Sequence, residues 1–166
     1  GRNERLEQLG RHPDWHFYGG DFPPFEALME AQTCLVRRHP NTTFISAHLC
    51  SYVENLGWVS DLLDACPNLN VDLSARYEEL GRQPYTARRF FLRHADRILF
   101  GADFEPEAWH YRVLFRFLET DDEYFPYAIG PRPQKGRWRI YGIFLPDDVL
   151  RKVYAENAAR LIPGVR

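Results

Sequence analysis

Apolar residues along the chain alternate between helix-like and strand-like spacing. Residues 25–38 carry apolar side chains three and four positions apart, which predicts an amphipathic helix that ends before Pro40. The same spacing recurs over residues 54–65 and 85–94. Short apolar runs typical of buried strands lie between and after these helices: Thr42–Ala47, Leu69–Val71 and Arg97–Ala102. The pattern predicts an α/β fold in which strands and helices alternate.

Each of the three predicted strands is followed by a polar residue suited to metal or proton chemistry. These residues are His48, Asp72 and Asp103, and the steps between them are 24 and 31 residues. Each step is long enough for a loop, a crossover helix and a return strand, so the strands are expected to be parallel. The carboxyl ends of parallel strands meet at one rim, where such folds place ligands and catalytic groups. The spacing therefore predicts an enzyme, or part of one.

A single domain is expected over residues 1–166. We assign residues 1–40 to helices before the first strand, residues 41–119 to βα units, and residues 120–166 to a long loop and a C-terminal helix. Loops as long as residues 120–144 commonly act as lids or binding loops. The aromatic residues of this loop predict that it packs against the domain: Tyr124, Phe125, Tyr127, Trp138, Tyr141 and Phe144.

Composition narrows the classes of partner. The chain is 45% hydrophobic and 27% charged, and its 21 Lys and Arg residues are balanced by 23 Asp and Glu residues, for a net charge of −2. There is no basic run for nucleic acid and no stretch of about 18 apolar residues for a membrane. We expect a small-molecule substrate, no nucleic-acid or membrane partner, and a cytoplasmic location. Homo-oligomerisation is left open.

The three cysteines, Cys34, Cys50 and Cys66, are widely spaced and form no CxxC pair. This spacing predicts free thiols, because neither a zinc nor a redox motif is present. Cys34 and Cys66 fall on apolar helix faces and are predicted to be buried. Cys50 stands two residues after His48 and is the one cysteine with a candidate position near a site.

Several segments resemble the amidohydrolase-related metal-dependent hydrolases, in the branch that includes aminocarboxymuconate semialdehyde decarboxylase. The matching segments occur in the family's order and spacing: His39–His48, Pro67–Arg76, Glu79–Pro84, Asp96–Asp103, Leu145–Asp147 and Asn157–Leu161. The resemblance implies a (β/α)₈ barrel in which the strands here are the sixth, seventh and eighth. A whole barrel takes about 250 residues. The chain is therefore expected to be the C-terminal portion of a barrel that is truncated at its N-terminus.

The resemblance also implies a catalytic site. A single divalent cation, zinc or alternatively manganese, would be held by Asp103 and by histidines outside this chain, since no two of its six histidines form the family's His-x-His pair. Such a metal lowers the pKa of bound water and makes hydroxide available near neutral pH. His48 and Asp103 are the implied catalytic residues, with His48 as general acid or base. The implied reaction is hydrolysis of a C–N, ester or lactone bond, or decarboxylation in the other branch.

Each assignment has a structural alternative. Asp103 could cap the following helix, and His48 could be a hydrogen-bonded core histidine. Asp72, a candidate supporting residue behind the site, could hold its own loop through bonds to the backbone. Arg76 could bind a substrate carboxylate through its two-pronged guanidinium group, or could pair with a nearby glutamate. The alternative to an enzyme is a non-catalytic half-barrel that binds or assembles through its open strand edges.

Overall fold

A three-stranded parallel sheet lies at the centre of the fold. The computed structural model describes residues 5–15, 17, 19–128 and 135–165. The strands follow the order β1-β2-β3 and have these bounds: β1 Phe44–Ser46, β2 Leu69–Asp72 and β3 Ile98–Leu99. Phe44 pairs with Leu69, and Val71 pairs with Ile98. This mixed α/β arrangement with a small parallel sheet confirms the predicted fold class and fits part of a barrel.

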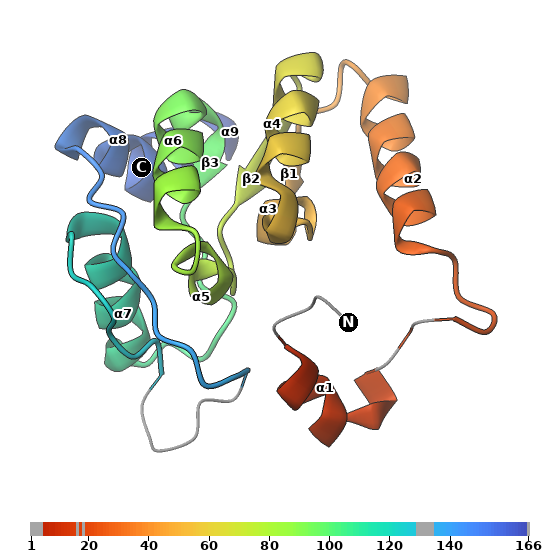
Figure 1. Ribbon diagram of the computed structural model, residues 1–166. Coiled ribbons are helices and arrows are strands. Elements are labelled where there is room, and N and C mark those ends of the chain that lie inside the picture. The colour runs from red at the N-terminus through yellow and green to blue at the C-terminus, as the bar shows by residue number, and fades with distance from the viewer. Residues whose placement is uncertain (1–4, 16, 18, 129–134, 166) are drawn as a thin grey trace.

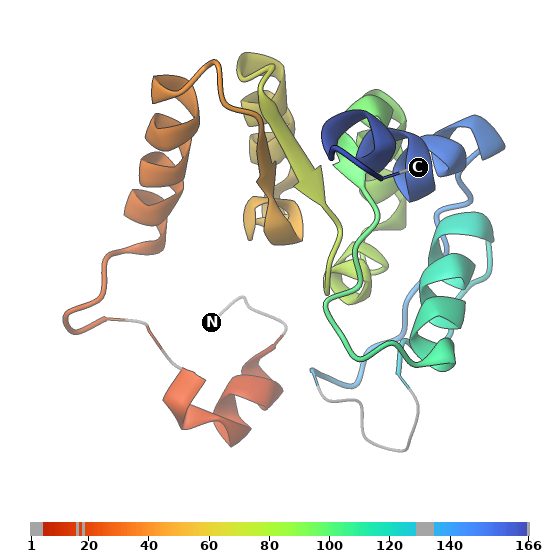
Figure 2. The same cartoon turned by 180° about the vertical axis from the view of Figure 1, so that it is seen from behind.

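Helices α4 and α6 cover one face of this sheet (Figure 1, Figure 2). The helices of the described residues have these bounds: α1 Leu6–Arg11, η1 Pro13–Trp15, α2 Phe25–Arg38, α3 Ala47–Cys50, η2 Val53–Asn55, α4 Leu56–Ala65, α5 Tyr77–Leu80, α6 Pro84–Arg93, η3 Ala95–Arg97, α7 Ala108–Glu119, α8 Asp147–Arg151, η4 Lys152–Glu156 and α9 Asn157–Leu161. In Figure 1, α4 and α6 lie in front of the strands. Figure 2 shows β1 and β2 from behind, with α4 on their far side.

The core forms between the sheet and α4, α6 and α7. Leu63 of α4 and Phe91 of α6 are almost wholly buried, as is Phe117 of α7. Burying a side chain of this size contributes about 1.5–3 kcal/mol to the free energy of unfolding. Pro84 occupies the first turn of α6, because its fixed φ suits a helix start.

The C-terminal helix is anchored to β3 and its flanks. The predicted C-terminal helix spans residues 147–161, with a π-helical turn, η4, between α8 and α9. The Phe100 backbone N–H donates to the Val153 carbonyl at 2.9 Å. The buried Asn157 side chain donates to the carbonyls of Ala95 and Ile98 at 2.7 and 2.8 Å. These bonds fix the helix beside the last strand of the sheet.

The helix α2 packs less completely than its apolar pattern predicted. Met29 and Val36 are buried, but Cys34 is exposed, so the prediction of a buried Cys34 was wrong. Its side of the helix has no covering partner among the described residues. Cys66 is buried as predicted. Cys50 is also buried, and burial raises the pKa of its thiol to about 11, which makes it a poor nucleophile.

The long segment after α7 is held to the domain by only some of its aromatic residues. Phe125 and Tyr127 are buried, and Phe125 forms an isolated antiparallel bridge with Ile140 through two 3.0 Å backbone bonds. Packing is confirmed for these residues. Tyr124 and Phe144 are 69% and 57% exposed and contribute less: Tyr124 meets Tyr141 of the same segment, and the Arg88 guanidinium lies over the Phe144 ring.

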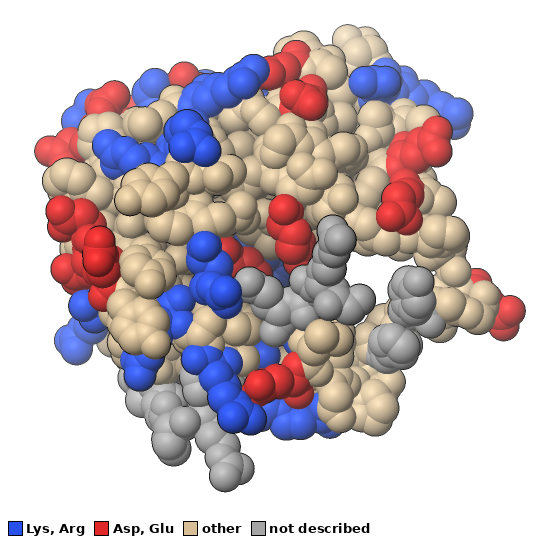
Figure 3. All heavy atoms as spheres, viewed as in Figure 1, with Lys and Arg blue, Asp and Glu red and all other residues tan. Residues whose placement is uncertain are grey.

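The surface visible in Figure 3 carries both signs of charge. Lys and Arg side chains lie interspersed with Asp and Glu side chains on this face. Within the described ranges, no helix combines the length and apolar character needed to cross a bilayer. The expectation of no nucleic-acid or membrane partner stays a prediction.

Replacing Asn157 with Leu is expected to lower the free energy of unfolding by about 2 kcal/mol, because two buried carbonyls lose their donor. Urea titration followed by circular dichroism measures the change. The control is Glu156→Gln on the exposed side of the same helix, which should change stability by less than about 0.5 kcal/mol. Equal effects of the two variants would contradict the anchoring role.

The free energy of unfolding is expected to decrease as the pH falls, because of the buried side chain of His94. This side chain is buried with its Nε2 2.6 Å from Ser60 Oγ, and burial lowers its pKa below the ordinary value of 6.5. Below about pH 6.5, His94 therefore binds a proton more readily in the unfolded chain than in the folded chain. The stability contributed by the neutral imidazole is complete above about pH 6.5 and is lost as the pH falls below it.

Urea titrations at pH 7.5 and 5.5 test this linkage. The stability difference between the protein and His94→Gln should shrink at pH 5.5. The exposed Thr43 provides the control, since Thr43→Ser removes no titratable group and should leave the pH dependence unchanged. A His94→Gln variant that loses as much stability in acid as the unsubstituted chain would disprove the assignment.

Candidate functional site at the carboxyl ends of the strands

His48 lies at the end of β1 in a left-handed backbone turn. The φ angles from His48 to Ser51 are 58°, 53°, 58° and 56°, a conformation costly for residues other than glycine. The His48 Nδ1 lies 2.8 Å from the Ser74 carbonyl. A carbonyl oxygen can only accept, so Nδ1 carries the hydrogen and donates it. Nε2 is left facing the Asp103 Oδ2 at 3.8 Å.

Asp72 holds this arrangement in place. Its Oδ1 accepts the backbone N–H of His48 at 2.9 Å and that of Ser74 at 3.0 Å. The carboxylate therefore supports its own loop, as the structural alternative proposed, and at the same time fixes the backbone of His48. Sequence reasoning missed Ser74, whose carbonyl sets the orientation of the imidazole.

Backbone strain occurs after all three strands. His48, Ala75 and Asp103 have φ angles of 58°, 49° and 58°. Strained residues of this kind tend to cluster at functional sites, where the surrounding structure holds them. Gly101 permits the close approach of the last two loops, since a Cβ there would collide with Ser74 Oγ.

Asp103 is available for chemistry rather than helix capping. The next helix, α7, begins at Ala108 with Glu107 as its N-cap residue, so the capping alternative was wrong. Asp103 is 59% exposed and His48 is 29% exposed. Asp103 also lines a pocket of about 510 Å³. The structure therefore brings His48, Asp72 and Asp103 to one rim, as the spacing predicted.

Aromatic rings form much of this pocket. Phe104 stacks on His110 at a centroid distance of 4.3 Å, and Tyr77 meets Phe104 edge-on at 5.9 Å. Trp109 lies against His110, and Tyr127 lines the same pocket from the long C-terminal segment. A pocket with such walls favours flat or cationic groups.

A cluster of charges, mostly buried, borders the pocket through Glu78 and Lys135. Lys135 Nζ is 3.0 Å from Glu78 Oε1 and 3.8 Å from Glu79 Oε1, and it donates to the Ala75 carbonyl at 2.9 Å. Arg5 Nε lies 3.2 Å from Glu79 Oε1. Burial raises the pKa of Glu78 and lowers that of Lys135. Sequence reasoning missed this cluster, because no pattern marks a contact between residues so far apart.

The Arg76 side chain contacts the protein backbone rather than a glutamate. Its guanidinium donates to the Ala75 carbonyl at 2.9 Å, and burial lowers its pKa. Glu78 forms an ion pair with Lys135, and Glu79 forms ion pairs with Lys135 and Arg5. The proposed binding of substrate by Arg76 stays a prediction.

The described residues do not make a complete metal centre. Catalytic zinc sites use three protein ligands. His48 Nε2 and Asp103 Oδ2 provide two donors that face one another, whereas Asp72 Oδ1 is occupied by two backbone N–H groups. Among the described ranges, no group of three His, Cys, Asp or Glu side chains is placed to hold a metal.

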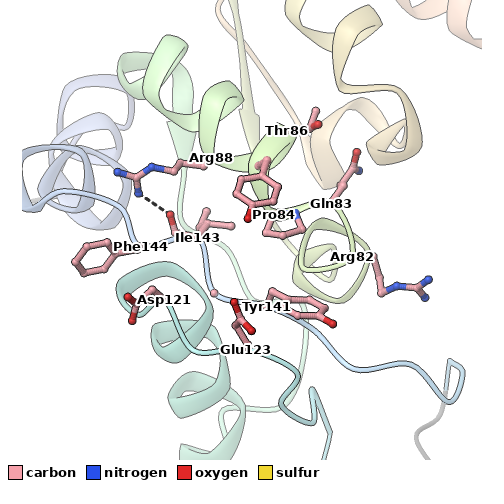
Figure 4. Close-up of a pocket in the computed structure, with 12 residues that line it drawn as sticks. Arg82, Gln83, Pro84, Thr86, Arg88, Asp121, Glu123, Tyr141, Ile143 and Phe144 are labelled. Carbon is pink, nitrogen blue, oxygen red and sulfur yellow. Dashed lines mark hydrogen bonds between the residues drawn. The ribbon is translucent and has the colours of Figure 1, made fainter.

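A second pocket lies away from these residues. It has a volume of about 680 Å³ and lies between the start of α6 and the segment before α8 (Figure 4). Arg88 crosses it and donates to the Ile143 carbonyl at 2.7 Å. Its other charged groups include Asp121 and Glu123. Mixed charges far from the strand ends give no basis for a catalytic assignment.

Comparison with known proteins identifies the class of protein. The chain belongs to the Amidohydrolase family, whose model matches residues 3–164. Neither a curated protein nor a solved structure matches it. The match confirms the predicted family and supports an enzyme of the hydrolase type from a family that generally uses divalent metals. The resemblance to the decarboxylase branch stays a prediction.

Asp72→Ala is expected to destabilise the chain by about 2 kcal/mol, because the N–H groups of His48 and Ser74 lose their common acceptor. Asp72→Asn retains an oxygen acceptor of the same shape and should cost about half as much. Urea titration gives both values, and the amide ¹H–¹⁵N shifts of His48 and Ser74 report the local bonds. Equal losses in the two variants would rule out the hydrogen-bond explanation.

Proposed function

We propose that this chain forms part of a metal-dependent hydrolase that cleaves a C–N, ester or lactone bond of a small molecule. One observation carries the proposal: the Nδ1 bond to the Ser74 carbonyl turns His48 Nε2 toward Asp103 at the carboxyl ends of parallel strands. A basic nitrogen and a carboxylate face the same point with 3.8 Å between their nearest atoms. This arrangement suits proton transfer to or from a water molecule.

The chemistry follows from the protonation states. In neutral His48 the Nε2 lone pair accepts a proton from water as the water oxygen attacks the substrate carbonyl carbon. The same proton then passes from Nε2 to the leaving nitrogen or oxygen as its bond to that carbon breaks. Asp103 orients the water and stabilises the imidazolium that forms between these steps. A bound divalent metal would supply hydroxide near neutral pH.

We further propose that β1, β2 and β3 are the sixth, seventh and eighth strands of a (β/α)₈ barrel. The remaining metal ligands would then come from strands outside this sequence. Exposed apolar residues support this: Ile45 on β1 is 40% exposed, and Leu28 and Leu35 on α2 are 47% and 51% exposed. Among the described residues, β1 pairs with β2 alone. Further strands would cover these surfaces, and a second copy of the chain is the alternative cover.

Two other functions compete with hydrolysis. Decarboxylation needs a substrate that carries a carboxylate. The carboxylates of Asp103, Glu105 and Glu107 line the pocket and would repel such a substrate, so the charge of the pocket favours hydrolysis. A non-catalytic binding or assembly module is supported by the two-donor site in the described part of the chain. Zinc, with manganese as the alternative, and a cytoplasmic location remain predictions.

The test uses the protein expressed together with any coding sequence found upstream of Gly1. We expect about one zinc or manganese per chain after dialysis, and hydrolysis of one member of a panel containing a nitrophenyl ester, an acylated amine and a lactone. His48→Asn should lower kcat by about 10²–10⁴-fold and leave the metal content unchanged. Asp103→Asn should lower both kcat and the metal content. Asparagine tolerates the left-handed backbone at these positions.

Glu123→Gln, in the pocket of Figure 4, is the control and should change neither kcat nor metal content. The hydrolase assignment fails if the extended protein binds no metal, or if His48→Asn hydrolyses its substrate at the original rate. The non-catalytic module then becomes the better description.

A further inference from the structure

The pocket of Figure 4, which has no part in the proposed reaction, presents aromatic rings to solvent. Tyr85, Tyr141 and Phe144 line its volume of about 680 Å³. Tyr85 is 80% exposed and Phe144 is 57% exposed, so both rings are accessible to a ligand. Single exposed rings are ordinary on a protein surface, but several that line one pocket indicate a binding surface.

The backbone holds the Phe144 ring in this exposed place. Its φ angle is 43°, a conformation that is costly for an aromatic residue. The Phe144 N–H donates to the Thr120 carbonyl at 3.1 Å, and the Ile143 N–H donates to the Phe117 carbonyl at 2.8 Å. The Arg88 guanidinium lies 5.9 Å from the centre of the Phe144 ring and donates to the Ile143 carbonyl. The ring is therefore fixed before any ligand arrives, which lowers the entropy cost of binding.

The charges that line this pocket balance. Arg82 and Arg88 contribute two positive groups, and Asp121 and Glu123 contribute two negative groups. A pocket without net charge has little long-range attraction for either cations or anions. The balance therefore favours a neutral ligand.

Polar groups stand beside the rings. The phenol groups of Tyr85 and Tyr141 can each donate and accept a hydrogen bond. Asp121 is exposed, and its carboxylate forms no hydrogen bond or ion pair with the described residues. In Figure 4, Asp121 lies on the same side of the pocket as Phe144. Hydrogen-bonding groups next to an apolar ring face match a ligand whose own ring has an apolar C–H face and several hydroxyl groups.

We propose that this pocket binds a neutral carbohydrate. One face of a sugar ring packs on Phe144 and Tyr85, and the hydroxyl groups of the sugar donate to Asp121. The volume of the pocket lies within the range of small-molecule sites and admits a disaccharide. Neither His48 nor Asp103 lines this pocket, so the inference does not rest on the proposed hydrolysis.

A proline-rich peptide is the other ligand that packs on exposed rings. Its prolines have no N–H group, and their carbonyls only accept hydrogen bonds. A carboxylate also only accepts, so Asp121 is matched by the hydroxyl groups of a sugar and not by such a peptide.

Cellobiose, maltose and lactose are the probes, and binding is followed by ¹H–¹⁵N NMR of the full chain. At least one of them should shift the amide signals of residues 121–123 and 142–144 to saturation and leave those of His48 and Ser74 in place. 1,4-Cyclohexanedimethanol has an apolar ring with only two hydroxyl groups and should bind about tenfold more weakly than that sugar.

Two matched variants test the ring. Phe144→Asn tolerates the left-handed backbone and should weaken sugar binding about three- to tenfold. Tyr124→Asn removes another exposed ring with a positive φ, of 51°, that does not line the pocket, and it should leave the affinity nearly unchanged. Asp121→Ala should also weaken binding about three- to tenfold, and Asp121→Asn, which keeps an oxygen acceptor, should do so less.

Three results would overturn the proposal. The first is that none of the three sugars shifts the signals of the pocket. The second is that folded Phe144→Asn and Asp121→Ala both bind the sugar as the unsubstituted chain does. The third is that a proline-rich peptide binds at the same signals more tightly than any of the sugars, which would make the pocket a peptide site.

Discussion

The carboxylate of Asp72 is the constraint on which the site depends. It accepts N–H groups from two different loops, those of His48 and Ser74, and so ties the end of β1 to the end of β2. The turn that begins at His48 is left-handed over four residues, a conformation that the chain would leave without such support. Because the Ser74 carbonyl then receives the imidazole, one carboxylate sets both the backbone and the ring of His48.

The site and the pocket are built by different means. His48 comes two residues after the end of β1, and Asp103 comes four residues after the end of β3, so the sheet limits where both can lie. Glu78 stands on the short helix α5, and Lys135 comes from the distant C-terminal segment, so their position depends on a buried ion pair. The position of the proposed reacting groups therefore follows from the strands, while the buried ion pair depends on a contact between segments distant in sequence.

The sequence predicted the elements whose signal is local. Short apolar runs ending at His48, Asp72 and Asp103 identified the strands, and the steps between them implied parallel neighbours. Apolar spacing says which face of a helix is apolar but not whether anything covers it, which is why Cys34 is exposed. The contact of Lys135 with Glu78 has no local pattern, because neither neighbouring sequence encodes the other's position.

Folding order follows from the contacts that complete the pocket. Lys135 bonds the Ala75 carbonyl and Trp138 Nε1 donates to the Glu78 carbonyl, each across 60 residues of chain. A contact between residues so far apart in sequence requires a long loop to close, which lowers the entropy of the chain before the contact contributes any energy. Such contacts are therefore expected to form after the local βα units. The strands and the rim residues can assemble early on the emerging chain. The pocket is complete only when the segment after α7 lies against α5 and the loop before it.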